Sequence, residues 1–284
     1  MATVNGVARR AKRATRRTAA NPALELLERA GYAVRGVLYA VMGSFALGLA
    51  LGVGGRATDP SGAVVILTGV PAGKAILVAV ILGLTAYSIW GFVRAVFDPL
   101  HRGDDPAGIA QRLGFVWSGI AYASIAIFAM RLLAGSATPG HHDGLQQAIA
   151  QILGYPAGHV LTAAIGTIAI GAGLAQFVDA YKATFKKDLK RTRMNRAEKD
   201  IVDTLGRLGM VSRGITFTLV GWFVLQAGLH NDPTQAHGYG GAFLFLLGEP
   251  FGRALLAIVS AGFIALGMHS FACARWIRLL GSDR

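Results

Sequence analysis

The stretch that decides the fold is Gly69-Val70-Pro71-Ala72-Gly73-Lys74, because it occurs three times along the chain. The other two copies are Gly154-Tyr155-Pro156-Ala157-Gly158-His159 and Gly248-Glu249-Pro250-Phe251-Gly252-Arg253. Each copy reads Gly-x-Pro-x-Gly-basic and opens a long apolar run, and an alanine stands six residues before each one, at Ala63, Ala148 and Ala242. This recurrence predicts a protein built from three copies of one helical hairpin.

Apolar segments dominate the whole chain. Hydrophobic residues make up 53% of its 284 residues and charged residues only 15%, with a mean hydropathy of +0.48. Soluble domains contain about 25% charged residues, whereas about 20 consecutive apolar residues cross a bilayer as a helix. Backbone inside a bilayer must satisfy its own hydrogen bonds, so each span is expected to be helical. The six predicted spans are residues 32–52, 72–96, 113–133, 158–178, 209–229 and 251–271.

The basic residues predict the topology. On one side of the six spans, residues 1–35, 94–112, 182–213 and 275–284 hold 24 of the 28 Lys and Arg residues. Cytoplasmic loops carry such an excess, so both termini are expected in the cytoplasm. Because the charge lies next to the spans instead of forming a separate basic domain, we expect no nucleic-acid partner.

The predicted fold class is an all-α membrane protein with six transmembrane helices, arranged as three tandem, parallel helical-hairpin repeats. Each repeat has two spans, so all three point the same way, and a pseudo-threefold axis along the membrane normal follows. Ungapped alignment of the repeats supports this with the columns Tyr39/Tyr122/Phe217, Gly43/Ala126/Gly221 and Phe45/Phe128/Phe223. The predicted organisation is a basic cytoplasmic tail (1–20), repeat 1 (21–99), repeat 2 (104–181), a basic cytoplasmic linker (182–199) and repeat 3 (200–278).

Local signals predict details of each repeat. A short helix over residues 23–28 is expected at the cytoplasmic interface, and Asn195 with Glu198 resembles a capping box. In each repeat a short helix before the Gly-x-Pro-x-Gly motif is expected to lie on the outer surface and cap the axis. The motif proline is predicted in the first turn of the following helix, and the glycine two residues before it is predicted to reverse the chain.

The same residues carry a resemblance to a known family. The pattern Arg-x-Gly-x-x-x-(Arg/Ser)-Gly, which begins at Arg29, Arg112 and Arg207 and is followed by the outer motif, resembles the bacterial membrane family of domain of unknown function 1206 over about residues 20–280. The resemblance implies a multi-pass protein of the bacterial plasma membrane whose unit is a pair of transmembrane helices. It brings no catalytic residues. Ser118 departs from Arg35 and Arg213, which argues against a strictly threefold site.

The first helix of each repeat offers two candidate roles. Its glycines, including Gly43 and Gly221, are predicted to let helices approach closely in lipid. Its arginines either extend to the headgroups or form a basic pocket for an anionic lipid headgroup between helices. The candidate headgroup contacts are Arg29, Arg35, Arg112, Arg207 and Arg213.

Other polar residues suggest weaker candidates. Polar groups at depth in a membrane tend to face the bundle interior. Three such residues are Arg131 and Gln226, which share one repeat column, and His269, which could hydrogen-bond across helices or relay protons. The outer loops hold His141, His142, His159, His230 and His237, but without the His-x-x-x-His spacing of a helical metal site.

These observations predict a non-enzymatic scaffold or lipid-contacting membrane module. No nucleophile–base pair, phosphate-binding loop or paired carboxylates are visible, so no catalytic residue, cofactor or resident metal is expected. The expected partners are membrane lipids, through anionic headgroups at the cytoplasmic face, and a possible membrane protein. The alternatives are a small-solute or ion transporter or channel along the axis, or an extracytoplasmic metal-binding protein.

Overall fold

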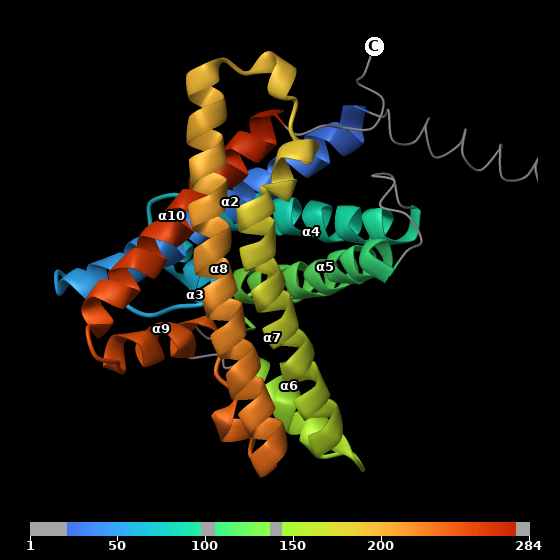
Figure 1. The fold of residues 1–284 in the computed structure, drawn as a ribbon, viewed down its shortest axis with the longest axis vertical. Helices are drawn as coiled ribbons and strands as arrows, with labels where there is room; N and C mark the ends of the chain where they lie inside the picture. Colours follow the sequence, from blue (N-terminus) through green and yellow to red (C-terminus); the bar gives the residue numbers. More distant parts are fainter. Residues whose placement is uncertain (1–21, 98–105, 137–143, 277–284) are drawn as a thin grey trace, which may run out of the picture.

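The computed structural model describes residues 22–97, 106–136 and 144–276, and within these ranges the protein is helical without strands (Figure 1). Each repeat consists of a long helix, a short helix and a second long helix. They are α2 (Pro22–Leu51), α3 (Pro60–Thr68) and α4 (Gly73–Phe97) in repeat 1; α5 (Pro106–Leu133), α6 (Gly144–Leu153) and α7 (Gly158–Lys182) in repeat 2; and α8 (Arg196–His230), α9 (Tyr239–Gly248) and α10 (Gly252–Trp276) in repeat 3. The predicted all-α fold with six long helices in three repeats is confirmed, whereas the predicted pseudo-threefold symmetry is not.

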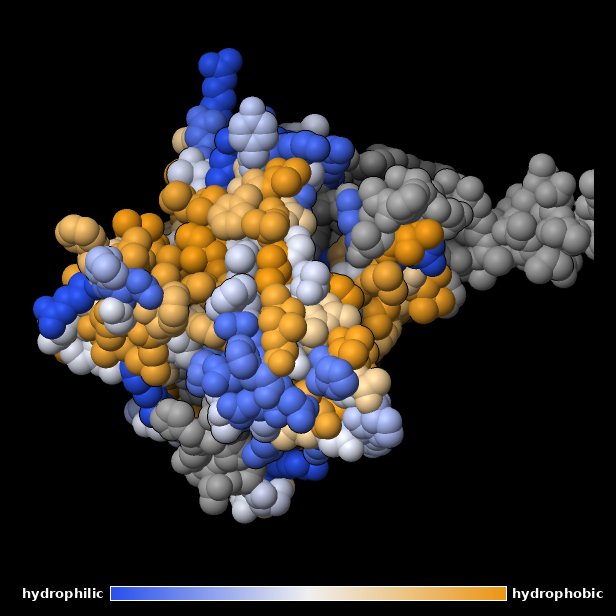
Figure 2. All heavy atoms as spheres, turned by 60° about the horizontal axis from the view of Figure 1, so that its bottom comes forward, coloured by the Kyte–Doolittle hydropathy of each residue, from blue (hydrophilic) through white to orange (hydrophobic). Residues whose placement is uncertain are grey.

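The six long helices are each apolar and long enough to cross a membrane. A 24-residue helix is about 36 Å long, against about 30 Å for the hydrocarbon core of a bilayer. Hydrophobic side chains cover wide stretches of the surface between separate hydrophilic patches (Figure 2). We call the ends at which α2, α5 and α8 begin the basic end of the bundle; α4, α7 and α10 finish there. The short helices lie towards the opposite end (Figure 1).

The long helices pack mainly between repeats. The second long helix of each repeat lies along the first long helix of the next: α4 along α5, α7 along α8, and α10 along α2. Within repeats, α2 packs on α4 and α8 packs on α10, but α5 and α7 do not pack against each other. The neighbours therefore run in the order α5, α4, α2, α10, α8, α7, and this series is open between its two ends.

The same positions meet at all three interfaces between repeats. Each time a glycine of the first long helix faces a phenylalanine of the preceding repeat: Gly36 faces Phe271, Gly119 faces Phe92, and Gly214 faces Phe177. Deeper along the same helices, a Cβ added at Gly43 would lie 2.8 Å from the backbone nitrogen of Ile264. One added at Gly221 would lie 2.6 Å from the backbone nitrogen of Ile170. The expected close helix crossings at these glycines are therefore present.

A second set of contacts closes the hairpins of repeats 1 and 3 but not that of repeat 2. A Cβ added at Gly31 would lie 2.7 Å from Tyr87 Cβ, and one added at the aligned Gly209 would lie 2.7 Å from Leu266 Cβ. The aligned glycine of α5, Gly114, has no atom within 4 Å of such a Cβ. Contact is thus lost at this position, and α5 stands apart from α7.

One residue of α7 explains the separation. Counted from the Gly-x-Pro-x-Gly motif, Gly83 of α4 and Gly262 of α10 occupy one column, and each faces the first long helix of its own repeat. Repeat 2 has Ile168 in that column, and its side chain is 71% exposed. A branched side chain in place of glycine keeps two backbones from approaching closely.

The motif turns the chain differently from the prediction. The backbone nitrogens of Gly73, Gly158 and Gly252 donate to the carbonyls three residues earlier, which places each proline second in a four-residue turn before the helix begins. The left-handed residue is the one after proline, namely Ala72 (φ 64°), Ala157 (φ 60°) and Phe251 (φ 61°). Proline second and a positive φ third is the pattern of a type II turn.

The two motif glycines have different roles. The first glycine does not reverse the chain, since Gly69 has the ordinary helical φ of −80°. The second glycine is the sterically required one, because a Cβ at Gly73, Gly158 or Gly252 would collide with carbonyls at the end of the short helix. The prediction that the first glycine supplies the reversal was therefore wrong.

Two further predictions on helices need correction. Residues 23–28 do not form a separate interfacial helix, because α2 runs unbroken from Pro22 to Leu51. The short helices are not simple surface helices either: Ala63 and Val64 of α3, and Ala242 and Phe243 of α9, are fully buried. Their apolar side chains exclude water by packing into the bundle.

The basic linker between repeats 2 and 3 is folded onto the basic end. It forms two 3-10 turns, η1 (Thr184–Asp188) and η2 (Arg191–Arg193), and the backbone nitrogen of Lys190 donates to the carbonyl of Trp276 at the end of α10. The predicted capping box is present, since Asn195 and Glu198 each accept the other's backbone N–H at the start of α8. The predicted tail (1–20) lies outside the described residues.

Candidate functional site

A cluster of arginines and tyrosines lies inside the bundle, near the middle of the long helices. It collects side chains from all three repeats, and we call it the arginine–tyrosine cluster. Its members are Arg35 and Tyr39 of α2, Tyr87 of α4, Tyr122 of α5, Arg213 of α8 and Tyr239 of α9. Arg35 and Tyr39 lie one turn apart on one face of α2, as residues at i and i+4 do.

Arg35 is surrounded by aromatic rings. Its Nη1 donates a hydrogen bond of 2.7 Å to the hydroxyl of Tyr87. Its guanidinium carbon lies 5.6 Å, 5.4 Å and 5.8 Å from the ring centres of Tyr32, Tyr39 and Tyr87. Cation–π contacts of this kind stabilise a buried guanidinium but do not neutralise its charge.

Two aligned tyrosines connect repeats 1 and 2. The hydroxyls of Tyr39 and Tyr122 are 3.1 Å apart and share a hydrogen bond. The ring of Tyr122 also packs edge-on against Tyr87, with centres 4.8 Å apart. All three tyrosines are buried, whereas Arg35 and Arg213 keep part of their surface exposed.

Arg213 approaches the same cluster from repeat 3. Its guanidinium carbon lies 4.8 Å from the ring centre of Phe217, and its charge interacts with Tyr39, Tyr239 and Arg35. Tyr239, the first residue of α9, reaches this position from the short-helix side and packs 5.8 Å from the ring of Phe217. Like charges repel strongly in a medium of low dielectric constant, so the two guanidiniums disfavour each other.

Within the part of the chain that the structure describes, no carboxylate pairs with Arg35 or Arg213. The Nε atom of each is buried and has no hydrogen-bond partner. Burial of a charge without an opposite charge is costly. The planar fork of a guanidinium matches the oxygens of a phosphate or carboxylate, so an anion between the two arginines would remove this cost.

A neighbouring arginine, Arg94, differs from these two in having a carboxylate partner, although its Nε is also buried without a hydrogen-bond partner. Arg94 of α4 forms an ion pair with Glu28 of α2, and both side chains are buried. Arg94 also donates to the hydroxyl of Tyr32 over 3.3 Å and lies over the ring of Trp90. The charge of Arg94 therefore has an opposite charge inside the protein.

The other candidate headgroup contacts lie nearer the basic end and differ from each other. Arg112 donates from Nε to the carbonyl of Ala95 over 2.8 Å, so it binds the end of α4. Arg29 is half-buried and Arg207 is exposed. Arg35 and Arg213, one and a half turns further along their helices, are half-buried and contact the rings of the cluster.

The three candidate intramembrane polar residues lie apart. Arg131 is exposed near the end of α5, and Gln226 is half-buried. His269 is buried, and its Nδ1 bonds the carbonyl of Val202 on α8 at 3.1 Å, which is the cross-helix hydrogen bond that the sequence suggested. Because Nδ1 then carries the proton, Nε2 is the acceptor for the thiol of Cys273, 3.5 Å away.

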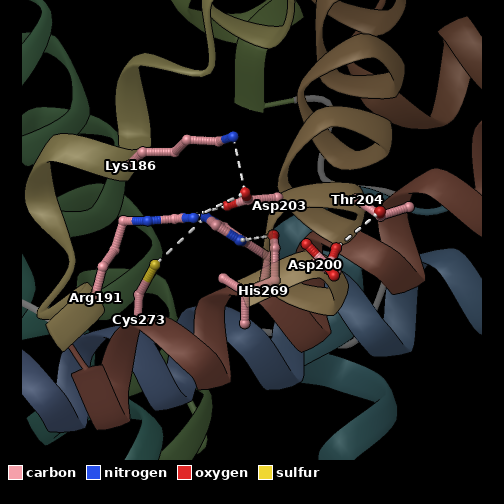
Figure 3. A network of polar contacts seen from close by, with 8 residues as sticks. Lys186, Arg191, Asp200, Asp203, Thr204, His269 and Cys273 are labelled. Atoms are coloured by element: carbon pink, nitrogen blue, oxygen red, sulfur yellow. Dashed lines mark hydrogen bonds and ion pairs between the residues drawn. The ribbon is translucent and has the colours of Figure 1, made fainter. Parts of the chain in front are cut away.

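The linker adds an ion-pair network beside His269 (Figure 3). Asp203 of α8 accepts from Nη1 of Arg191 at 2.6 Å and pairs with Lys186 at 2.7 Å. Phe185 packs edge-on against the ring of His269, with centres 4.9 Å apart. These contacts hold the linker against α8 and α10 and give it a structural role.

The loop histidines form no site among the residues described. His141 and His142 fall outside those ranges, and the others, His159, His230 and His237, are exposed. The nearby Asp232 is engaged in its own turn, where hydrogen bonds from the hydroxyl and backbone of Thr234 hold its pKa below the ordinary value. No group of three or more potential metal ligands occurs in the described ranges.

The fold and the cluster together define a multi-pass membrane protein of three two-helix repeats. The family model for the Domain of Unknown Function (DUF1206) matches residues 30–98, 113–183 and 208–276, and the chain belongs to this family. It is 32% identical over 249 residues to "Uncharacterized protein YxxB" of Bacillus subtilis (strain 168), covering 88% of this chain and 90% of that protein. No solved structure matches the chain.

Sequence reasoning found both arginines of the cluster but not their tyrosine partners. Tyr39 and Tyr122 were visible as an aligned column, and the spacing of Arg35 and Tyr39 placed them on one helix face. Tyr87 and Tyr239 gave no signal of this kind, because one comes from the second long helix and the other from a short helix. The direction of both arginines depends on the rotation of α2 and α8 in the bundle.

Proposed function

We propose that this protein is a non-enzymatic membrane module that binds an anionic group at the arginine–tyrosine cluster. The observation that carries the proposal is the pair of half-buried arginines, Arg35 and Arg213, which have tyrosines as partners and no carboxylate partner among the described residues. Two guanidiniums supply charge and directed donors, and the tyrosine hydroxyls add neutral donors. The chemistry suits a phosphate, and a carboxylate less well because it carries a single charge.

Lipids are the expected partners of this module. The cluster lies about 9 Å deeper than Arg29 and Arg207, and the exposed Arg207 and the linker lysines add positive charge at the basic end. Basic pockets between transmembrane helices on the cytoplasmic side bind anionic headgroups. A membrane-protein partner fits the same role, since the exposed faces of the long helices are apolar.

Transport of a small anion is the second candidate function. The location of the cluster inside the bundle favours it, because a carrier must hold its substrate away from both surfaces. Anion uptake into vesicles containing the purified protein, absent for Arg213→Gln, would support transport. Binding without uptake supports the module.

We further propose that the protein lies in the bacterial plasma membrane with both termini in the cytoplasm. The support is the placement of 24 of 28 basic residues on one side of the six spans. Reporter domains fused after Ser136 and after Arg193 are then expected in opposite compartments, the first outside and the second in the cytoplasm. Finding both in the same compartment would contradict the six-span topology.

Anion binding has a direct test in the thermal unfolding of protein that has been purified in mild detergent and stripped of lipid. Inorganic phosphate is expected to raise the unfolding midpoint, since a ligand at 100 times its Kd adds about 2.7 kcal/mol of stability. Arg213→Gln is expected to lose this rise. Without phosphate, the same variant is expected to be at least as stable as the wild type, because one of two repelling charges is gone.

The matched control is Arg207→Gln, which removes an exposed arginine from the same helix. It is expected to keep the full response to phosphate. An equal response in the wild type and in Arg213→Gln, or no response in either, would contradict an anion site at the cluster.

A further inference from the structure

We infer that the anion is the phosphate of a membrane phospholipid, which reaches the arginine–tyrosine cluster sideways through the opening between α5 and α7. This inference rests on the proposed anion site and adds the class of ligand and its route. A phosphate dissolved in the cytoplasm offers the same chemistry, and the experiment below separates the two sources.

The opening lies at one defined place in the bundle. Each long helix packs against the next in the order α5, α4, α2, α10, α8, α7. A closed ring of six helices would also need contact between α7 and α5, and this contact is missing. Only 17% of the span is buried in α5 and in α7, against 39% or more in each of the other four long helices. A ligand from the lipid phase meets the least protein on this side.

Both helices beside the opening expose apolar side chains that suit acyl chains. Those exposed on α5 include Leu113, Trp117 and Ile120, and those exposed on α7 include Ile168 and Ala172. Acyl chains gain from contact with such a surface, whereas a hydrated free phosphate does not. The opening therefore fits a ligand with a charged head and an apolar tail.

The headgroup of such a ligand would meet the cluster on the side of repeat 2, which supplies no arginine. The two arginines come from repeats 1 and 3, and the aligned residue of α5 is Ser118, one turn before Tyr122. Tyr122 is the member of the cluster that α5 supplies, and its hydroxyl bonds Tyr39. Repeat 2 thus lacks an arginine at this position, and it also lacks the contact between its two long helices, α5 and α7. The opening and the positive charge of Arg35 and Arg213 therefore lie on the same side of the bundle.

The depth also agrees with a lipid of the leaflet at the basic end. Arg35 and Arg213 lie six residues beyond Arg29 and Arg207, which is about 9 Å along a helix. A phosphate held there lies about 9 Å deeper than Arg29 and Arg207, and a phospholipid inserted at this depth keeps its chains in the hydrocarbon. Partial exposure of both arginines leaves the guanidiniums accessible to it.

The experiment compares three probes on the lipid-free, detergent-purified full chain. They are phosphatidylglycerol, its deacylated headgroup glycerophosphoglycerol, and inorganic phosphate, each titrated while the unfolding midpoint and the bound mass in native mass spectrometry are recorded. Phosphatidylglycerol is expected to raise the unfolding midpoint at a concentration about tenfold lower than the two probes without acyl chains need. Arg213→Gln is expected to weaken the binding of phosphatidylglycerol about tenfold or more.

Two tryptophan variants test the route. Ala172 of α7 is exposed and corresponds to Tyr87 and Leu266, which close the other two hairpins, so Ala172→Trp narrows the opening. This variant is expected to weaken the binding of phosphatidylglycerol about tenfold and to leave the binding of inorganic phosphate unchanged. The control Leu174→Trp lies on the same helix, aligned with the exposed Ile89 and Met268, and is expected to change neither.

The outcomes separate the two claims. If all three probes raise the unfolding midpoint equally and each effect is lost in Arg213→Gln, the anion site is supported and the phospholipid is ruled out as its specific ligand. No action of any probe would overturn both. Wild-type chains that associate in native mass spectrometry, and separate in Ala172→Trp with lipid binding unchanged, would assign the opening to a second copy of the chain and also overturn the lipid route.

Discussion

Replacing Glu28 by alanine is expected to lower the free energy of unfolding by about 3–5 kcal/mol, because it leaves the charge of Arg94 buried without its partner. Glu28 is 2% exposed and Arg94 7% exposed, so water cannot take the place of the lost carboxylate. The pair joins α2 to α4 at the basic end of repeat 1. The measurement is the unfolding of detergent-purified protein by increasing amounts of a denaturing detergent.

Two control variants show whether the cost comes from the unpaired charge. The double variant Glu28→Leu with Arg94→Leu removes both charges, and it is expected to recover most of the lost stability, since apolar replacement of a buried pair is often neutral or better. Glu198→Gln removes a carboxylate from the exposed capping box and is expected to cost under about 1 kcal/mol. A double variant no more stable than Glu28→Ala would mean that packing, and not charge, dominates at this site.

Replacing Gly221 by leucine is expected to cost about 1–3 kcal/mol or to prevent folding, because the added side chain meets the backbone of α7 and not a movable side chain. A Cβ there would already lie 2.6 Å from the nitrogen of Ile170. Gly43→Leu is expected to act similarly against α10, where the nearest atom, Ile264 N, is at 2.8 Å. Thermal midpoints in detergent measure both effects.

The matched control is Gly171→Leu on α7. Gly171 has open space around a Cβ, so leucine there meets no obstacle and is expected to stabilise the helix by up to about 1 kcal/mol. Equal loss of stability in Gly171→Leu and Gly221→Leu would show that the cost comes from exposing leucine and not from the helix crossing.

The helices and their grouping could be predicted because the signals for them are local. An apolar run long enough to span a bilayer must be helical there, and the repeated Gly-x-Pro-x-Gly motif marks where one helix ends and the next begins. The Asn195–Glu198 capping box is equally local and was confirmed. Within the same motif, prediction failed at the backbone level, since a left-handed Ala72 between proline and glycine is contrary to the usual preference for glycine.

The candidate site was predicted only in part because a side chain's direction is not a local property. Arg29 and Arg35 differ by six residues and look alike in the sequence, yet one lies near the basic end and the other among the rings of Tyr39 and Tyr87. The rotation of α2 about its axis makes this difference, and that rotation is set by Gly36 and Gly43, which place α2 against α10.

The sequence by itself therefore determined the number, length and repetition of the helices, since hydrophobic length and turn-forming residues act within each segment. Only the tertiary structure decided which helices are neighbours, and each repeat packs more closely on the next repeat than within itself. In lipid no general hydrophobic force selects the partner of a helix. The fit of small residues on one helix to side chains on another therefore decides which helices pack together. That fit fails between α5 and α7, where a Cβ on Gly114 would meet nothing and Ile168 replaces glycine. The bundle is therefore open near Arg35 and Arg213, which have no carboxylate partner among the described residues.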